Sequence, residues 1–247
     1  MAGNSTDGAR EDSQDASRVA FFGGSFDPPH LGHLAVARAA RIALNLDTVL
    51  FAPVGVQPLK PQGATASYQD RLAMTRLAIA AEPAFRLSEI DAPGDSGTPN
   101  YTIDTLHRLR RQLPPQSVLL CLMGADSFLA LRSWHRAAEI PFTAPLIVAS
   151  RPGESLADLE SALPPGLAFQ SNTTEQSNVG GVELLSLAVR NPDGDRTPFY
   201  LLPGLEVEIS ASAIRRRVQT QLRTATSARG LLPEPVAEYV RAHNLYR

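Results

Sequence analysis

The sequence predicts an α/β fold in which a doubly wound parallel sheet is flanked by helices, with a small helical portion at the C-terminus. Short apolar runs that end at glycine or proline alternate with amphipathic stretches, at the spacing of βαβ units. Polar residues gather directly after these runs, where the carboxyl ends of strands are expected. With 43% hydrophobic residues among 247, the chain has enough apolar material for a sizeable core.

Residues 1–17 are polar and contain no apolar segment, so we expect a disordered tail that is neither a signal peptide nor a membrane anchor. No stretch approaches the ~18 consecutive apolar residues that span a bilayer. The single Cys121 cannot form an intrachain disulfide, which fits a reducing cytoplasm. A net charge of −2 provides no broad basic field. We therefore expect a cytoplasmic protein without nucleic-acid or membrane partners.

The first strand and helix are predicted from one stretch near the N-terminus. The apolar run at 19–22 predicts a buried strand that Gly23 and Gly24 end. Two prolines delay the following helix until His30. Apolar residues at i, i+4, i+8 and i+11 predict its buried face, formed by Leu31, Ala35, Ala39 and Ile42.

The rest of the chain continues the alternation. Further strands are expected at 48–52, 85–90, 117–123, 146–150, 184–189 and 199–202. Helices are expected at 68–81, 100–113, 134–140, 209–222 and 233–246. Ser67, with Asp70 three residues later, predicts a capping box. Residues 153–182 are weakly patterned and predict a surface excursion with one short helix at 155–163. We expect a single Rossmann-like domain over 18–247.

The end of the first strand is a candidate phosphate site. Glycines let the backbone approach a ligand closely, and a helix start offers unpaired N–H groups and the positive end of the helix dipole. His30 and His33 lie three residues apart, so both would face the same anion, as neutral donors or as cations near pH 6–7. A rigid turn with two surface histidines is the alternative. Metal binding is less favoured because no third His or Cys lies nearby.

Three more places carry polar groups at expected strand ends or helix starts. Asp126 follows the most apolar strand, where its carboxylate could meet ribose hydroxyls or cap a helix. Ser210, Ser212 and Arg215 lie at a helix start, where arginine is unfavourable unless an anion also binds; a solvated basic face is the alternative. Lys60 lies in a loop framed by prolines, either as a mobile cation or as a surface lysine.

Two aromatic residues are candidates for a second ligand. Trp134, the only tryptophan, could stack on an aromatic ring or pack in the core. Tyr101 and Thr102 begin a predicted helix whose exposed amides could receive a carboxylate.

Three segments, GGSFDPPHLGH at 23–33, MGAD at 123–126 and ISASAIR at 209–215, resemble in this order the nucleotidyltransferase superfamily with an H-x-G-H signature. The YTIDTL and SRPG stretches, with Trp134, narrow the resemblance to the bacterial nicotinate-nucleotide adenylyltransferase family, over about residues 18–246. The resemblance implies transfer of AMP from ATP to nicotinate mononucleotide, which yields deamido-NAD and pyrophosphate, with Mg²⁺ accompanying ATP.

The resemblance also implies a role for each candidate residue. His30 and His33 would contact the ATP phosphates, with Lys60 as a further cation. The rest of the ATP site, including the contacts to the ribose and to the β- and γ-phosphates, would consist of Gly23, Gly24, Ser25, Phe26, Gly124, Asp126, Ser210, Ser212 and Arg215. The nicotinate carboxylate would bind the amides of Tyr101 and Thr102, and the pyridine ring would stack on Trp134.

The chain departs from the family pattern at two positions. Leu59 stands where the loop P-P-H-K usually has its histidine, and Ala211 replaces a common serine. The alternatives are a nicotinamide mononucleotide, phosphopantetheine or glycerol-phosphate nucleotidyltransferase, and, from another class, a catalytically silent nucleotide-binding regulator. A class I aminoacyl-tRNA synthetase shares the signature, but this chain has no room for anticodon-binding domains.

Overall fold

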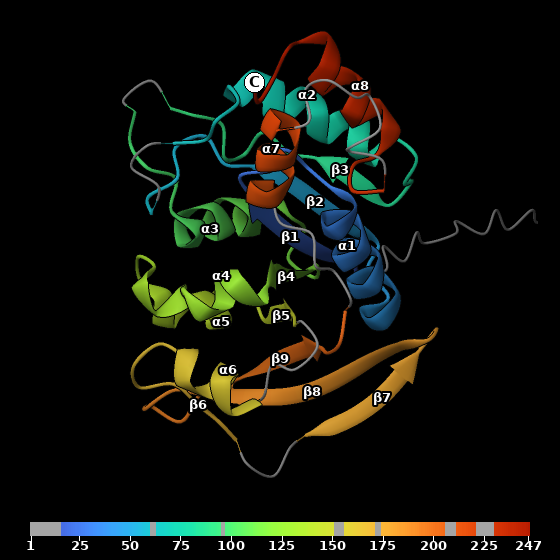
Figure 1. Ribbon diagram of the computed structural model, residues 1–247. Coiled ribbons are helices and arrows are strands. Elements are labelled where there is room, and N and C mark those ends of the chain that lie inside the picture. The colour runs from blue at the N-terminus through green and yellow to red at the C-terminus, as the bar shows by residue number, and fades with distance from the viewer. Residues whose placement is uncertain are drawn as a thin grey trace, which may run out of the picture.

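The computed structural model describes residues 16–59, 63–94, 97–150, 156–170, 174–205, 211–220 and 230–247. The strands in this part of the chain are β1 (Arg18–Gly24), β2 (Thr48–Pro53), β3 (Phe85–Leu87), β4 (Val118–Gly124), β5 (Leu146–Ala149), β6 (Ala168–Phe169), β7 (Glu175–Val179), β8 (Val182–Arg190) and β9 (Arg196–Leu202). They form one sheet in the order β3-β2-β1-β4-β5-β9-β8-β6, and β7 also pairs with β8 (Figure 1).

The described helices cover both faces of this sheet. They are α1 (Leu31–Leu44), α2 (Tyr68–Ile79), α3 (Thr102–Gln112), α4 (Ala125–Leu129), α5 (Ile140–Thr143), α6 (Leu156–Ala162), α7 (Ala211–Thr220) and α8 (Glu234–Ala242), with 3₁₀ turns η1 (Leu131–Ser133) and η2 (Ala137–Glu139). One apolar core joins α1, α2, α7 and α8 to the sheet, and a second joins α3 to α6 to the opposite face. Alternate β4 residues enter the two cores, so the strand is apolar throughout.

The predicted fold class is confirmed. Six strands, β3-β2-β1-β4-β5-β9, run parallel. The chain lays β2 and β3 on one side of β1 and then β4 and β5 on the other, so the winding reverses between β1 and β4. The carboxyl ends of these two strands are the expected position of a ligand in such a sheet.

The surface excursion predicted at 153–182 contains more regular structure than the sequence indicates. Its expected short helix is α6, but the same stretch also supplies β6 and β7, which pair antiparallel with β8. The sheet is therefore mixed at this end. All five residues of β7 are exposed. A strand with no buried face has no apolar alternation, which is why the sequence pattern did not predict it.

The predicted buried face of α1 is right at Ala39 and wrong at Ile42, while Leu31 is partly buried against the first core. Ile42 is 40% exposed, and its side chain contacts the β7–β8 turn at Gly180. Besides Ala39, the residues that α1 buries include Leu34, Ala37, Ala40 and Leu44. The alanines of this helix lie on more than one face, so the apolar spacing fits several faces and packing selects among them.

Among the local predictions, the cap of α2 is confirmed and the helix at 134–140 is not. The hydroxyl of Ser67 accepts the N–H of Asp70 at 3.1 Å and caps α2. The helix expected at 134–140 is instead the sequence of short turns η1, η2 and α5. Of the tail predicted at 1–17, residues 1–15 lie outside the described residues, and the carbonyl of Ser17 accepts the N–H of Val118.

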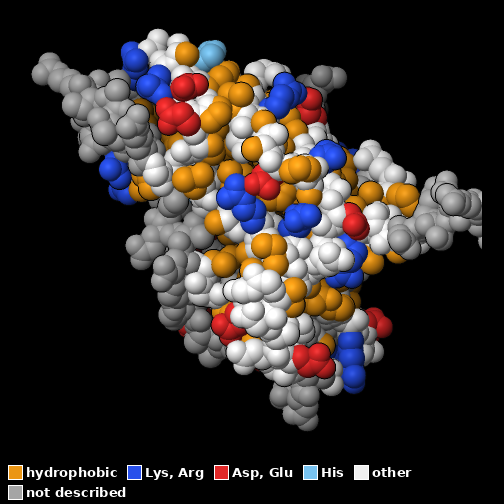
Figure 2. Space-filling model, turned by 90° about the vertical axis from the view of Figure 1, so that its right-hand side faces the viewer, with side chains coloured by type: hydrophobic (Ala, Val, Ile, Leu, Met, Phe, Trp, Pro, Cys, Tyr) orange, Lys and Arg blue, Asp and Glu red, His pale blue; other side chains and the backbone are white. Residues whose placement is uncertain are grey.

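No helix among the described residues is long and apolar enough to cross a membrane. Figure 2 shows one face of the molecule, on which Lys and Arg side chains are interspersed with acidic and apolar ones. That face therefore presents no broad field of one sign.

Candidate functional site

Two neighbouring cavities open at the carboxyl ends of β1 and β4. The first, which we call the histidine cavity, has a volume of about 330 Å³ and is lined by His30 and His33. The second, the tryptophan cavity, has a volume of about 400 Å³ and is lined by Trp134 and Tyr101. Both are lined by Gly23, Gly24, Gln57 and Ser127, so two ligands could meet there.

The structure brings together most of the predicted site residues. The predicted residues that line the histidine cavity are Gly23, Gly24, Ser25, Phe26, His30, His33, Gly124, Asp126, Ser212 and Arg215. Thr102 lines the tryptophan cavity beside Tyr101 and Trp134. Lys60 and Ser210 lie outside the described residues.

The turn after β1 is shaped by a glycine and a buried ring. A Cβ on Gly23 would lie 2.6 Å from the Phe21 ring, so a larger residue does not fit without a shift. Phe26 adopts a φ of 46° in the left-handed region, which costs a non-glycine residue of the order of 1 kcal/mol. Its ring is 1% exposed and packs edge-on against His33, with centroids 4.9 Å apart. The ring thus supports the imidazole from the core side.

The two histidines act as one unit at the start of α1. Their rings stack with centroids 3.7 Å apart and an interplanar angle of 22°. The backbone N–H of His30 donates to Nδ1 of His33 at 3.1 Å. Because Nδ1 accepts, the proton of the neutral His33 ring lies on Nε2, which can donate to an anion.

Burial keeps both imidazoles uncharged at pH 7. It lowers the pKa of His30 from 6.5 to about 4. Burial, and then the neighbouring His30, lower the pKa of His33 well below 6.5. The expectation that these rings gain charge near pH 6–7 is therefore wrong for the ligand-free protein, since the cavity desolvates them.

We expect the free energy of unfolding to fall as the pH is lowered from 6.5 to 4. His30 has its ordinary pKa of 6.5 when unfolded and a pKa of about 4 when folded, so the unfolded state binds more protons in this window. The contribution is intact above pH 6.5, and about 3 kcal/mol is lost by pH 4. Urea titrations at both pH values will show a smaller loss for His30→Gln. If His30→Gln lost as much free energy of unfolding between the two pH values as the wild type, the explanation would be contradicted. The control is His243→Gln, at an exposed histidine, which should lose as much as the wild type.

Arg215 of α7 lines the histidine cavity and is held there by the first loop. Its Nη1 donates to the carbonyl of Asp27 at 2.7 Å and lies 3.7 Å from that residue's carboxylate. Its Nη2 donates to the hydroxyl of Ser212 at 3.1 Å. The α7 arginine thus faces the first loop and contacts Ser212, which was also predicted to lie at the phosphate site.

Asp27 was not predicted, although it lies within the first motif. Its carboxylate is buried and accepts the backbone N–H groups of Thr65 and Ala66, at 2.7 and 3.1 Å. The hydroxyl of Tyr246 donates to it at 2.8 Å. The aspartate therefore ties the first loop to the entry of α2, to α7 and to the C-terminus. The sequence held one signal for it, an acidic residue between Phe26 and two prolines, but none for Tyr246.

Asp126 lies in the first turn of α4 and lines the histidine cavity. The N-cap residue of α4 is Gly124, so the alternative that Asp126 caps the helix is wrong. An exposed carboxylate at this position can accept hydrogen bonds from hydroxyl groups of a ligand in the cavity.

The tryptophan cavity combines aromatic walls with a helix start. Trp134 is half-buried against the second core, and the Tyr101 ring lies 4.4 Å from the ring of His135. Tyr101 is the N-cap of α3, so the first amides of this helix lie at the cavity wall. Such a wall fits a flat ring that carries an anionic group.

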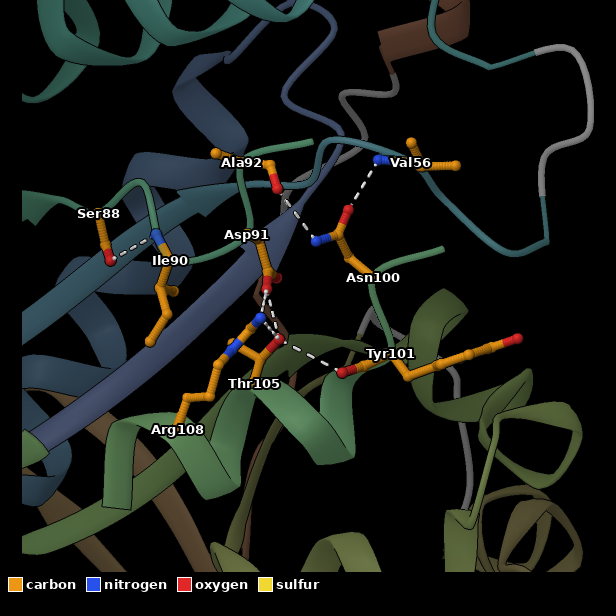
Figure 3. A network of polar contacts seen from close by, with 9 residues as sticks. All are labelled: Val56, Ser88, Ile90, Asp91, Ala92, Asn100, Tyr101, Thr105 and Arg108. Carbon is orange, nitrogen blue, oxygen red and sulfur yellow. Dashed lines mark hydrogen bonds and ion pairs between the residues drawn. The ribbon is translucent and has the colours of Figure 1, made fainter. Parts of the chain in front are cut away.

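A buried carboxylate anchors α3 beneath this cavity (Figure 3). The hydroxyl of Thr105 donates to Asp91, and Nη2 of Arg108 lies 3.2 Å from the same oxygen. The Thr105 hydroxyl also contacts the carbonyl of Tyr101 at 3.3 Å. Burial raises the pKa of Asp91, and the bonds from Thr105 and Arg108 oppose that shift. This network fixes the α3 start relative to the loop after β3.

Comparison with known proteins agrees with these features. The Cytidylyltransferase-like family matches residues 21–217. The probable nicotinate-nucleotide adenylyltransferase of Pelobacter propionicus is 37% identical over 231 residues, which cover 93% of this chain and 98% of that protein. The probable nicotinate-nucleotide adenylyltransferase of Sodalis glossinidius is 38% identical over 235 residues, covering 93% and 97%.

A solved structure shares the fold at low sequence identity. The nicotinic acid mononucleotide adenylyltransferase of Plasmodium falciparum, complexed with NaAD, superposes with a TM-score of 0.66 at 14% identity, over 93% of this chain and 97% of that one. The two curated relatives exceed 35% identity over almost their whole length. This chain therefore belongs to the nicotinate-nucleotide adenylyltransferase family.

Proposed function

We propose that this chain transfers AMP from ATP to nicotinate mononucleotide, releasing pyrophosphate and forming deamido-NAD. The observation that carries the proposal is the meeting of two cavities at Gly23 and Gly24, one lined by phosphate-binding groups and one by aromatic rings and a helix start. ATP occupies the histidine cavity, and the mononucleotide occupies the tryptophan cavity. A cytoplasmic location belongs to the proposal, since ATP is the donor.

The reaction needs alignment and charge neutralisation more than a strong base. An oxygen of the mononucleotide phosphate, already ionised at pH 7, attacks the α-phosphorus of ATP. The bond from that phosphorus to the oxygen bridging to the β-phosphate breaks, and pyrophosphate leaves. His33 donates through Nε2 to the charge that develops, and Arg215 and Ser212 face the departing phosphates.

Lys60, Ser210 and Mg²⁺ complete the proposed phosphate contacts. Among the described residues, no three His, Cys, Asp or Glu side chains lie close enough to hold a metal ion by themselves. Mg²⁺ is commonly held by substrate phosphates with one or two carboxylates, and Asp126 is such a carboxylate in the histidine cavity. When bound, the ion neutralises charge on the triphosphate.

A product assay with two mononucleotides tests the proposal. We expect a preference for nicotinate over nicotinamide mononucleotide of roughly 10- to 100-fold in kcat/KM, because the neutral amide loses a charge-assisted bond to the α3 amides worth about 1.5–3 kcal/mol. Liquid chromatography will identify deamido-NAD, and removal of Mg²⁺ with EDTA will abolish its formation. A preference for nicotinamide mononucleotide would contradict the substrate assignment, and ATP binding without pyrophosphate release would indicate a silent regulator.

A further inference from the structure

We propose that Gln57 is a phosphate-binding residue of this reaction, whose side-chain amide donates to phosphate oxygens where the two substrates meet. Gln57 follows β2 and lines both cavities, together with Gly23, Gly24 and Ser127. Its side chain is the longest of these four and carries two N–H donors. The proposal rests on the proposed function, because the phosphates it names are those of ATP and the mononucleotide.

The side chain of Gln57 is oriented by Ser25. The hydroxyl of Ser25 donates to Oε1 of Gln57 at 2.6 Å. Because Oε1 accepts this bond, the two hydrogens on Nε2 lie on the other branch of the amide and can donate elsewhere. Ser25 itself lines the histidine cavity, so the bond holds the amide beside the predicted phosphate site. An amide fixed in this way loses less conformational freedom when it binds an anion.

The backbone next to Gln57 is held as well. The N–H of Val56 donates to Oδ1 of Asn100 at 2.9 Å (Figure 3). The N–H of Asn100 donates to the carbonyl of Val56, also at 2.9 Å. Asn100 also donates to the carbonyl of Ala92 at 3.3 Å. A Cβ on Gly55 would lie 2.3 Å from the backbone nitrogen of Pro93, so the two loops touch directly. Gln57 is therefore a preorganised group rather than a side chain on a loose loop.

A neutral donor suits the junction of the two cavities. His30 and His33 are both uncharged at pH 7, and Leu59, which lines the tryptophan cavity, has no polar group to offer. An amide can enter the junction of the cavities without the desolvation cost of a buried charge. Gln57 thus supplies an N–H donor in the described part of the loop after β2, whereas Leu59 in the same loop supplies no donor.

Two substitutions separate phosphate binding from loop structure. Gln57→Ala removes the donor, and we expect kcat/KM to fall roughly 10- to 100-fold, as for a lost bond to a charged group. Gln57→Glu keeps the size and can still accept from Ser25, but it places a negative charge against the phosphates, so we expect a loss of about 10²- to 10³-fold. A purely structural role predicts the opposite order, with the isosteric glutamate closer to wild type.

The matched control is Gln112→Glu at the end of α3, about 15 Å from the helix start by the rise of 1.5 Å per residue. It should retain wild-type rates, and thermal melting should show all variants folded. Glutamate and alanine variants of equal activity would overturn the proposal for Gln57. If the wild type forms no deamido-NAD, the proposed function fails by itself. Calorimetry with ATP and with nicotinate mononucleotide, each alone, then decides: weaker binding to Gln57→Glu supports the phosphate contact, and unchanged binding overturns it.

Discussion

Replacement of His33 by alanine is expected to lower kcat/KM for deamido-NAD formation by about 10²- to 10³-fold, the scale of losing one preorganised transition-state donor. Nδ1 of His33 accepts the N–H of His30, so Nε2 holds the ring proton and is the donating atom. The ring is clamped between His30 and Phe26, at centroid distances of 3.7 and 4.9 Å. Close packing against Phe26 therefore holds the ring in this position. Steady-state kinetics with nicotinate mononucleotide and ATP measure the effect.

His107→Ala provides the control for this prediction. His107 lies on α3 and lines neither cavity, so its loss should leave the kinetics unchanged. Since the donor is a neutral imidazole, the wild-type rate should also hold between pH 7 and 8, above the lowered pKa of His33. A His33→Ala variant that turns over at the wild-type rate would exclude the ring from the reaction.

Asp27→Ala is expected to lower the free energy of unfolding by about 3–5 kcal/mol, the cost of removing one partner from a buried ion pair. The carboxylate of Asp27 is 3% exposed. Its removal leaves the N–H groups of Thr65 and Ala66 and the hydroxyl of Tyr246 without their acceptor. In this variant Arg215 keeps its hydrogen bond to the backbone carbonyl of residue 27 but loses the carboxylate charge that lies 3.7 Å from its Nη1. Urea unfolding at pH 7 measures the change.

Two variants calibrate the Asp27 result. Tyr246→Phe removes one hydrogen bond to the carboxylate and should cost only about 1 kcal/mol. Asp47→Ala removes an exposed carboxylate that accepts one backbone N–H, from Arg18, and should cost less than Asp27→Ala. If Asp27→Ala proves as stable as Asp47→Ala, the loop is not held by this carboxylate.

Some features of the site follow from neighbouring residues and were therefore predictable. Two glycines after a buried strand, two prolines and a His-x-x-His spacing define a turn into a helix, and the structure has that turn. The Ser67 cap of α2 is equally local, because it joins residues three apart. Local rules fail where the composition is uniform, as in α1, whose alanines allow several buried faces, and in the exposed strand β7.

By itself, the sequence determined the parallel α/β architecture, the histidine pair at the opening of α1 and the family to which the chain is similar, because each rests on short-range patterns or on contiguous motifs. Only the tertiary structure decided which distant residues hold the loops of the site in place. Tyr246 reaches Asp27 across 219 positions, and Asn100 reaches Val56 across 44. Contacts at such separations depend on the route of the chain around the sheet, and no periodicity records them. The desolvation that leaves His30 and His33 uncharged has the same origin, since the walls of their cavity come from segments far apart in the chain.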